Sequence, residues 1–252
     1  PNGNGETLWW SRRLAKGAFH PVISASLTTG PGMSLPAAFE GRLAIPAIAA
    51  PMFLVSGPDL VVETCRSGVI GTFPALNQRS SEGYDAWLSE IEEHLDNADC
   101  GDLPGPAPYG INLIVHRTNT RVEADLKITV AHKVPLVITS LGAVRDVVDA
   151  VHSYGGLVFH DVINLRHAEK AAEAGVDGII AVCAGAGGHA GTLSPFALVP
   201  EIKRMFDGTV VLSGALSTGA HVAAARMIGA DMGYFGTRFI ATQEGAAPED
   251  YK

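Results

Sequence analysis

One glycine-rich stretch combines a backbone suited to ligand binding with a titratable side chain. Residues 176–191 read VDGIIAVCAGAGGHAG, in which the apolar run Ile179–Val182 predicts a strand buried on both faces. The loop after it holds His189 among four glycines, whose missing Cβ atoms let backbone N–H groups approach a flat or anionic ligand: Gly185, Gly187, Gly188 and Gly191. Because an imidazole has an ordinary pKa of about 6.5, we predict that His189 is a catalytic acid or base. A surface histidine in a common glycine turn is the alternative interpretation.

Small, backbone-exposing residues follow two further apolar runs. They are Ser213, Gly214 and Ala215 after one run, and Gly236 and Thr237 after the next. Their N–H groups and hydroxyls suit a phosphate, and Gly187 and Gly188 complete the set. We therefore predict an anion-binding cradle made by three neighbouring loops, although glycines also serve simply to make tight turns.

Neutral polar residues end the other apolar runs. They are Asn112, Thr139, Ser140 and His160, with Asp161 next to the histidine, and we also count Asn77, in the loop after the second run, with the cofactor-binding residues. Neutral groups around a phosphate corner favour a mononucleotide cofactor. His160 and Asp161 could be read as metal ligands, but neighbouring strand residues point to opposite faces, so we predict no metal site. The glycines approximate a dinucleotide-binding fingerprint, yet no acidic residue follows at the spacing that a ribose needs.

The elements that must position these residues alternate between short apolar runs and helical patterns, as in βα units with a parallel sheet. Strands are predicted at 44–50, 69–72, 109–113, 136–139, 157–160, 179–182, 210–212 and 232–235. Helices are predicted at about 58–67, 84–95, 121–132, 143–153, 165–174, 195–206 and 218–228. Eight strands, each followed by a helix except the last, predict a TIM barrel whose C-terminal part is truncated. A doubly wound open sheet is the second choice.

Length and composition agree with one α/β enzyme domain. The 252 residues are 47% hydrophobic and 17% charged. Residues 1–32 lack sustained periodicity, so we expect a disordered leader or expression-derived segment there and the barrel domain at residues 33–252. The net charge of -8 argues against nucleic acid or an anionic membrane and for a small-molecule substrate. Three widely spaced cysteines indicate neither disulfides nor zinc and fit a reducing cytoplasm. A homodimer is left open.

Five segments resemble the nitronate monooxygenase family, formerly called 2-nitropropane dioxygenases. They are AIAAPM (Ala47–Met52), GINLIVH (Gly110–His116), AGAGGHAG (Ala184–Gly191), LSGALSTG (Leu212–Gly219) and GADMGYFGTRFIAT (Gly229–Thr242). The resemblance covers roughly residues 43–252 in the right order. Flavin-dependent enoyl reductases of fatty-acid synthesis and related quinone reductases share the signature.

The resemblance implies an FMN-binding TIM barrel. Ala50, Pro51 and Met52 would lie against the isoalloxazine ring, and the predicted cradle would hold the ribityl phosphate. His189 would remove the proton next to the nitro group of a nitroalkane, or hold the anionic nitronate beside the flavin. The implied reaction converts a nitronate and O2 to a carbonyl compound and nitrite.

The sequence departs from the family pattern in two ways. Val182 and Gly185 stand where several relatives carry polar or acidic side chains, so Asn112 or His160 would have to supply the lost contact. We also expect this chain to lack the family's longer C-terminal part, which helps to cover the substrate. Three alternatives stay open: an NAD(P)H-dependent flavin reductase of an enoyl thioester or quinone, a phosphate-binding barrel without flavin, and an inactive fragment.

Overall fold

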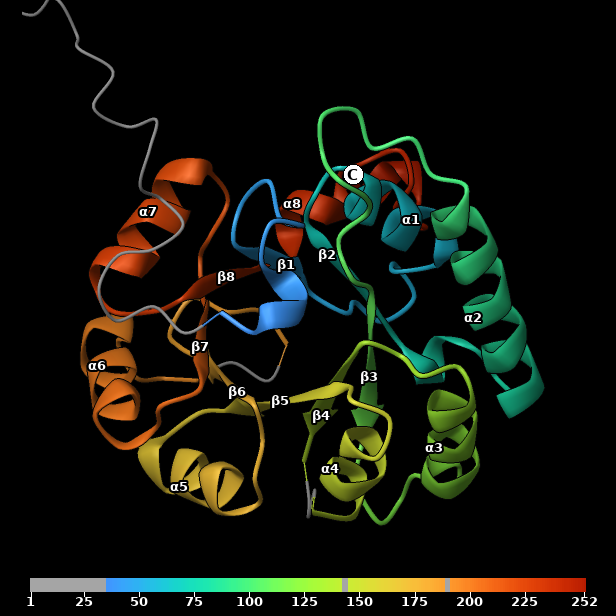
Figure 1. Cartoon of the computed structure of the whole chain (residues 1–252). Helices are drawn as coiled ribbons and strands as arrows, with labels where there is room; N and C mark the ends of the chain where they lie inside the picture. The colour runs from blue at the N-terminus through green and yellow to red at the C-terminus, as the bar shows by residue number, and fades with distance from the viewer. Residues whose placement is uncertain (1–34, 142–144, 189–190) are drawn as a thin grey trace, which may run out of the picture. The chain divides into compact units, whose positions relative to one another are not determined.

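Parallel strands and helices alternate along the chain, and the strands close into a barrel in which the last strand pairs with the first (Figure 1). This computed structural model describes residues 35–141, 145–188 and 191–252. The strands are β1 (Ala47–Ala49), β2 (Ile70–Pro74), β3 (Gly110–Ile114), β4 (Leu136–Ser140), β5 (Leu157–Val162), β6 (Gly178–Val182), β7 (Thr209–Ser213) and β8 (Met232–Phe235). The predicted TIM barrel is confirmed, and the open sheet is excluded because β1 pairs with β8.

Helices cover the outside of the barrel (Figure 1). They are α1 (Pro58–Arg66), α2 (Ser81–Asp96), α3 (Val122–Ala131), α4 (Arg145–His152), α5 (Leu165–Glu173), α6 (Pro195–Met205), α7 (Gly219–Met227) and α8 (Thr237–Ile240). Side-chain caps mark where two of these helices begin. The Ser80 and Asn164 side chains accept hydrogen bonds from backbone N–H groups in the first turns of α2 and α5. Pro195 opens α6 after Ser194, as predicted, although the Ser194 side chain makes no capping bond.

Two apolar layers follow from the alternation of side chains along each strand. One cluster fills the barrel with strand residues such as Ile48, Ile138 and Phe159, and is closed at one end by Phe39. The other cluster lies between strands and helices and takes the intervening residues, such as Val137 and Val158. A residue's position along a strand therefore decides whether it faces the barrel interior or the helices.

The first strand is shorter than predicted, at Ala47–Ala49 instead of 44–50. Pro46 has no N–H to donate, and the N–H of Ala44 bonds to the carbonyl of Gly68 before the barrel begins. At the other end of the chain, α8 is a single short helix of four residues, Thr237–Ile240, where the sequence predicts a missing or rudimentary one.

The compact unit that holds the barrel is Met33–Lys252. The predicted leader, residues 1–32, lies outside the described residues, so its character stays a prediction. None of the helices in the described part of the chain is long and apolar enough to cross a membrane.

Candidate functional site

The loop after β1 is held in a fixed shape by one buried hydroxyl. Ala50 extends the barrel pairing by donating its N–H to the carbonyl of Phe235 at 2.8 Å. The Ser56 hydroxyl accepts from the Met52 N–H at 3.0 Å and donates to the Ala50 carbonyl at 3.4 Å. A Cβ on Gly236 would lie 3.9 Å from Met52 Sδ. The predicted flavin-contacting residues after β1 therefore lie beside the predicted phosphate-binding residues after β8.

Asn77 holds this loop through its side-chain amide. Its Nδ2 donates to the carbonyls of Met52 at 3.0 Å and Ser56 at 2.8 Å, and its Oδ1 accepts from the Leu54 N–H at 3.0 Å. Leu54 has a φ of 60°, so the loop contains a residue in a conformation that side chains rarely adopt. Both amide hydrogens of Asn77 are used within the protein, which gives this predicted cofactor-binding residue the role of shaping the loop.

A polar layer crosses the inside of the barrel at the carboxyl ends of β3, β4 and β5. Asn112 Nδ2 donates to Ser140 Oγ at 2.8 Å, and Ser140 Oγ donates to Asp161 Oδ2 at 2.7 Å. Asn112 also donates to the Ile138 carbonyl at 3.2 Å and is buried. The chain of donors ends on a carboxylate, so it fixes Asp161 and orients negative charge toward the barrel mouth.

Tyr234 of β8 packs against the same interior cluster. Burial, and then the charge of Asp161, hold the pKa of the Tyr234 hydroxyl well above its usual value. The hydroxyl is therefore a neutral hydrogen-bond donor at physiological pH. Together with Asn112, Ser140 and Asp161 it forms the polar floor, a name we use for these four residues.

Thr139 and His160 lie on the opposite face of their strands from the polar floor. They are paired neighbours in the β4–β5 register, one residue away from Ile138 and Phe159, which face the interior. Thr139 Oγ1 and His160 Nδ1 are 2.8 Å apart, and burial lowers the pKa of His160 to about 4. The structure thus places these two predicted cofactor-binding residues toward the helices, with a neutral imidazole. Their role toward a cofactor stays a prediction.

The loops after β6 and β7 are built against one another. Ala215 donates its N–H to the Gly185 carbonyl at 3.1 Å, and Cys183 donates to the Ser213 carbonyl at 2.8 Å. Gly214 has a φ of +144°, and a Cβ there would lie 2.9 Å from the Ala184 carbonyl oxygen, so this approach requires glycine. Ala215 adopts a φ of 54°. Backbone strain of this kind is typical of ligand-binding loops.

Gly187 and Gly188 behave differently from Gly214. A Cβ on either residue would meet no atom of the described residues within 4 Å. Nothing in the described protein requires the absence of a side chain at Gly187, whose φ lies outside the left-handed region. A flat or anionic ligand lying against the loop would explain why residue 187 is a glycine. Ser213, buried at the end of β7, and Gly236 with Thr237 after β8 stand at the neighbouring strand ends. These residues could hold a phosphate group, and their role toward a cofactor stays a prediction.

The predicted catalytic residue, His189, lies outside the described residues, and its role stays a prediction. The thiol of Cys183 at the start of the same loop is protonated at neutral pH, because burial raises its pKa to about 11. Among the described residues, no three His, Cys, Asp or Glu side chains come together in a way that could hold a metal ion.

The hollows in the described protein do not by themselves identify the site. The larger, about 600 Å³, is lined by residues such as Leu157 and Thr209 at the amino ends of strands. TIM barrels bind their substrates at the carboxyl ends, so we discount it. A cavity of about 250 Å³ lies at the β1 loop, lined among others by Ser56, Asn77 and Trp87.

Sequence reasoning missed Ser56, and noted Ser140 and Asp161 at strand ends without choosing them as site residues. The strands carry apolar residues on both faces, so periodicity alone does not tell which polar residue points inward. Asn112 was predicted as a site residue and does face the interior. Its partner on β4 is the interior residue Ile138, so the pairing of these two strands shows which way Asn112 points.

Comparison with known proteins gives concordant results. Residues 106–252, more than half of the chain, match the family described as nitronate monooxygenase. A nitronate monooxygenase from Neurospora crassa is 29% identical over 235 residues, covering 80% of this chain and 61% of that protein. A (3aS,4S,5R,7aS)-5-hydroxy-7a-methyl-1-oxo-octahydro-1H-indene-4-carboxyl-CoA dehydrogenase from Rhodococcus jostii is 26% identical over 207 residues, covering 82% of this chain and 55% of that protein.

Solved structures share the fold. FabK from Thermotoga maritima superposes with a TM-score of 0.70 at 25% identity, over 81% of this chain and 62% of that one. A nitroalkane oxidase from Streptomyces ansochromogenes gives a TM-score of 0.71 at 22% identity, over 84% of this chain and 71% of that one, which shows the fold alone. The chain spans 55% and 61% of the two sequence relatives named above.

Proposed function

The chain belongs to the nitronate monooxygenase family, and from that premise we propose that it catalyses FMN-dependent oxidation of alkyl nitronates. The reaction would consume a nitronate and O2 and yield a carbonyl compound and nitrite. The family is one of flavin-dependent oxidoreductases; the identity of the flavin as FMN and of the substrate as a nitronate are parts of the proposal.

The observation that carries the proposal is the open backbone at Gly187 and Gly188, beside the strained Gly214 and Ala215. The matched residues 106–252 include all four. Backbone N–H groups at such a loop bind an anion without a positive side chain. A single phosphate is the anion that a mononucleotide presents, which favours FMN over a dinucleotide.

Bound FMN would supply the electron transfer from substrate to oxygen, and the protein's residues would do the rest. The β1 loop, held by Ser56 and Asn77, would support one face of the flat ring. The polar floor would offer a neutral donor from Tyr234 and a carboxylate acceptor from Asp161, which is held by the hydrogen bonds that run from Asn112 through Ser140. Preorganised donors and acceptors of this kind orient a ligand without moving during the reaction.

His189 is the proposed base. In a neutral nitroalkane it would accept the proton from the carbon next to the nitro group; with a nitronate already formed, a protonated His189 would hold the anion. It directly follows Gly188 of the proposed phosphate cradle in the sequence. The thiol of Cys183 does not compete for this role, because burial raises its pKa to about 11.

A reductase of the same family is the second candidate. The similarity to FabK and to a CoA-linked dehydrogenase favours it, since both are at least as similar to this chain as some nitronate monooxygenases. In that case NAD(P)H would reduce the flavin, and an enoyl thioester or quinone would reoxidise it. The two candidates share one site and differ in the electron donor.

An absorbance experiment separates the candidates. The purified protein is incubated with FMN, freed of excess flavin, made anaerobic, and mixed separately with the anion of 2-nitropropane and with NADH or NADPH. Bleaching of the flavin by the nitronate alone supports the proposal, with nitrite release in air as the following assay. Bleaching only by a nicotinamide supports the reductase. Failure to retain any flavin overturns both.

The histidine is tested in the same assay with His189→Asn. We expect bound flavin to stay near the wild-type content, while turnover of neutral 2-nitropropane falls by about 100-fold or more, the usual contribution of a general base. Turnover of the preformed nitronate should fall less, because its proton is already gone. Unchanged turnover of the neutral substrate would remove His189 from the role of base.

A further inference from the structure

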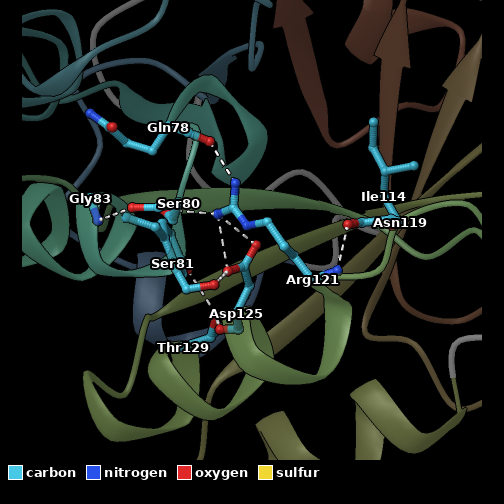
Figure 2. A network of polar contacts seen from close by, with 10 residues as sticks. Gln78, Ser80, Ser81, Gly83, Ile114, Asn119, Arg121, Asp125 and Thr129 are labelled. Atoms are coloured by element: carbon cyan, nitrogen blue, oxygen red, sulfur yellow. Dashed lines mark hydrogen bonds and ion pairs between the residues drawn. The ribbon is translucent and has the colours of Figure 1, made fainter.

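Arg121, which is outside the residues proposed to contact cofactor or substrate, joins the loops after β2 and β3. Its guanidinium donates from Nη1 to the Gln78 carbonyl at 2.6 Å and from Nη2 to the Ser80 carbonyl at 3.2 Å (Figure 2). Its own N–H donates to Asn119 Oδ1 at 3.1 Å, and Asn119 Nδ2 donates to the Ile114 carbonyl at the end of β3 at 3.0 Å. Arg121 therefore connects the two neighbouring loops that follow β2 and β3 at the carboxyl end of the barrel.

A buried carboxylate keeps the guanidinium in place. Asp125, one turn along α3 and fully buried, accepts from Arg121 Nη2 at 3.0 Å and from the Ser81 hydroxyl at 2.6 Å, both on Oδ1 (Figure 2). Asp125 Oδ2 is also 3.0 Å from Arg121 Nη2, an ion-pair distance without hydrogen-bond geometry. Such a pair has a high desolvation cost, which offsets much of its contribution to stability but leaves its hydrogen-bond geometry fixed. Here the geometry that it fixes is that of the Gln78 and Ser80 backbone.

The fixed backbone adjoins the residue that shapes the β1 loop. Gln78 directly follows Asn77, whose side-chain amide makes three hydrogen bonds to Met52, Leu54 and Ser56. The path from Arg121 to the β1 loop thus consists of two hydrogen-bonded steps joined by one peptide bond. A shift of the Gln78 carbonyl would move the Asn77 backbone, and with it the amide that holds the loop.

We propose that Arg121 is a positioning residue that sets the conformation of the β1 loop through Gln78 and Asn77. The claim that this loop contacts a flavin rests on the proposed function; the claim that Arg121 positions the loop does not. The fork of a guanidinium is needed, because two carbonyls and one carboxylate are contacted from different N–H groups. A lysine at 121 keeps the charge beside Asp125 but cannot reach all three acceptors in this fixed arrangement.

The chain offers a matched control for the loss of an ion pair. Lys203 of α6 lies 2.8 Å from Asp231 Oδ2, and the side-chain exposures of this pair are 20% and 1%, against 20% and 0% for Arg121 and Asp125. Asp231 accepts from the Val210 N–H at 2.7 Å at the start of β7, the opposite end of the barrel from the β1 loop. Lys203→Ala therefore removes a comparable cation without touching the proposed path.

Hydrogen exchange followed by NMR tests the proposal without any cofactor. The reporters are the N–H groups of Leu54, bonded to Asn77, and Met52, bonded to Ser56. We expect Arg121→Lys and Arg121→Ala to speed their exchange by about tenfold, the effect of one lost charge-assisted hydrogen bond, relative to Lys203→Ala. Lys203→Ala should instead speed exchange at Val210. Equal exchange at Leu54 and Met52 in the Arg121→Lys and Lys203→Ala variants would overturn the proposal.

A double-variant cycle tests the path. If Arg121 acts through Asn77, then Arg121→Lys should add little to the exchange at Met52 in a protein that already carries Asn77→Ala. Additive effects would overturn the path. FMN affinity, from quenching of flavin fluorescence, is the separate readout for function: it should weaken about tenfold in Arg121→Lys and stay near wild type in Lys203→Ala. A wild type that binds no FMN would refute the proposed function and leave the exchange result valid.

Discussion

At the scale of single residues, the two kinds of glycine in the proposed cradle give different predictions. Gly214 cannot accept a Cβ, so any substitution there disturbs the protein as well as a ligand. Gly187 has open space around its missing Cβ and a φ outside the left-handed region. We expect Gly187→Asp to leave the fold intact and to abolish FMN binding, because a carboxylate would face the phosphate. Flavin fluorescence quenching measures the binding and circular dichroism checks the fold.

Gly105 provides the control for this substitution. A Cβ there would also meet no atom within 4 Å, its φ is not left-handed, and it precedes β3 rather than following a strand. Gly105→Asp should bind FMN as the wild type does. Retention of full flavin binding by Gly187→Asp would count against the phosphate cradle as a whole.

Residues of the candidate site were predictable only where the backbone conformation requires a particular residue type. The glycines after β6, β7 and β8 were chosen because they follow apolar runs, and their binding role stays a prediction. The direction in which Thr139 and His160 point was not predictable, because the sequence does not tell which face of a doubly buried strand looks inward. In the structure, the strand pairing shows which face each residue occupies. His160 pairs with Thr139 on the helix side, and Asp161 hydrogen-bonds to Ser140 on the interior side.

At the scale of elements, α2 and α3 are joined by one histidine between two carboxylates. His132, after α3, lies 2.9 Å from Glu92 Oε2 and 3.0 Å from Asp85 Oδ1, both in α2. Burial lowers the pKa of His132, but hydrogen bonds and charges from Glu92 and Asp85 outweigh it and leave the pKa raised. Protonated His132 therefore stabilises the fold below the unfolded pKa of about 6.5, and this stabilisation is lost as pH rises through the folded-state pKa.

Urea unfolding checks this at about pH 5.5 and about pH 9, on either side of the ordinary histidine pKa. We expect the urea midpoint of the wild type to fall between the two pH values by more than that of His132→Gln. His94→Gln, in α2 but outside the cluster, should keep the wild-type pH dependence. If His132→Gln keeps it as well, the α2–α3 junction does not depend on the protonated imidazole.

Element boundaries were largely predictable because apolar runs and helical periodicity alternate without interruption. The predicted strand at 136–139 is β4, Leu136–Ser140, and the predicted helix at 165–174 is α5, Leu165–Glu173. Among the strands, the largest deviation is β1, where Pro46 interrupts an apolar run that otherwise continues. Loop structure was less predictable: the Asn77 and Arg121 contacts join residues that are distant in sequence and leave no periodic signal.

For the barrel as a unit, closure couples ligand binding to the stability of the whole fold. The proposed cradle belongs to β6, β7 and β8, and β8 pairs with β1, whose loop the proposed ring would contact. A ligand that binds there touches strands from both ends of the described barrel, so it should stabilise the folded state as a unit. The formal net charge of -8 opposes any anionic ligand, which makes a preorganised set of N–H groups more necessary.

Thermal unfolding with two flavins tests this linkage. FMN at about 100 times its Kd should stabilise the protein by about 2.7 kcal/mol and raise the Tm by about 5 to 10 °C for a barrel of this size. Riboflavin, which carries the same ring without the phosphate, should raise the Tm by less at the same concentration. In Gly187→Asp the additional Tm increase that the phosphate gives should be lost, so FMN should no longer raise the Tm by more than riboflavin does. Because the ring contributes in both cases and the phosphate in only one, a riboflavin shift equal to that of FMN in the wild type would mean that the glycine loops hold no phosphate.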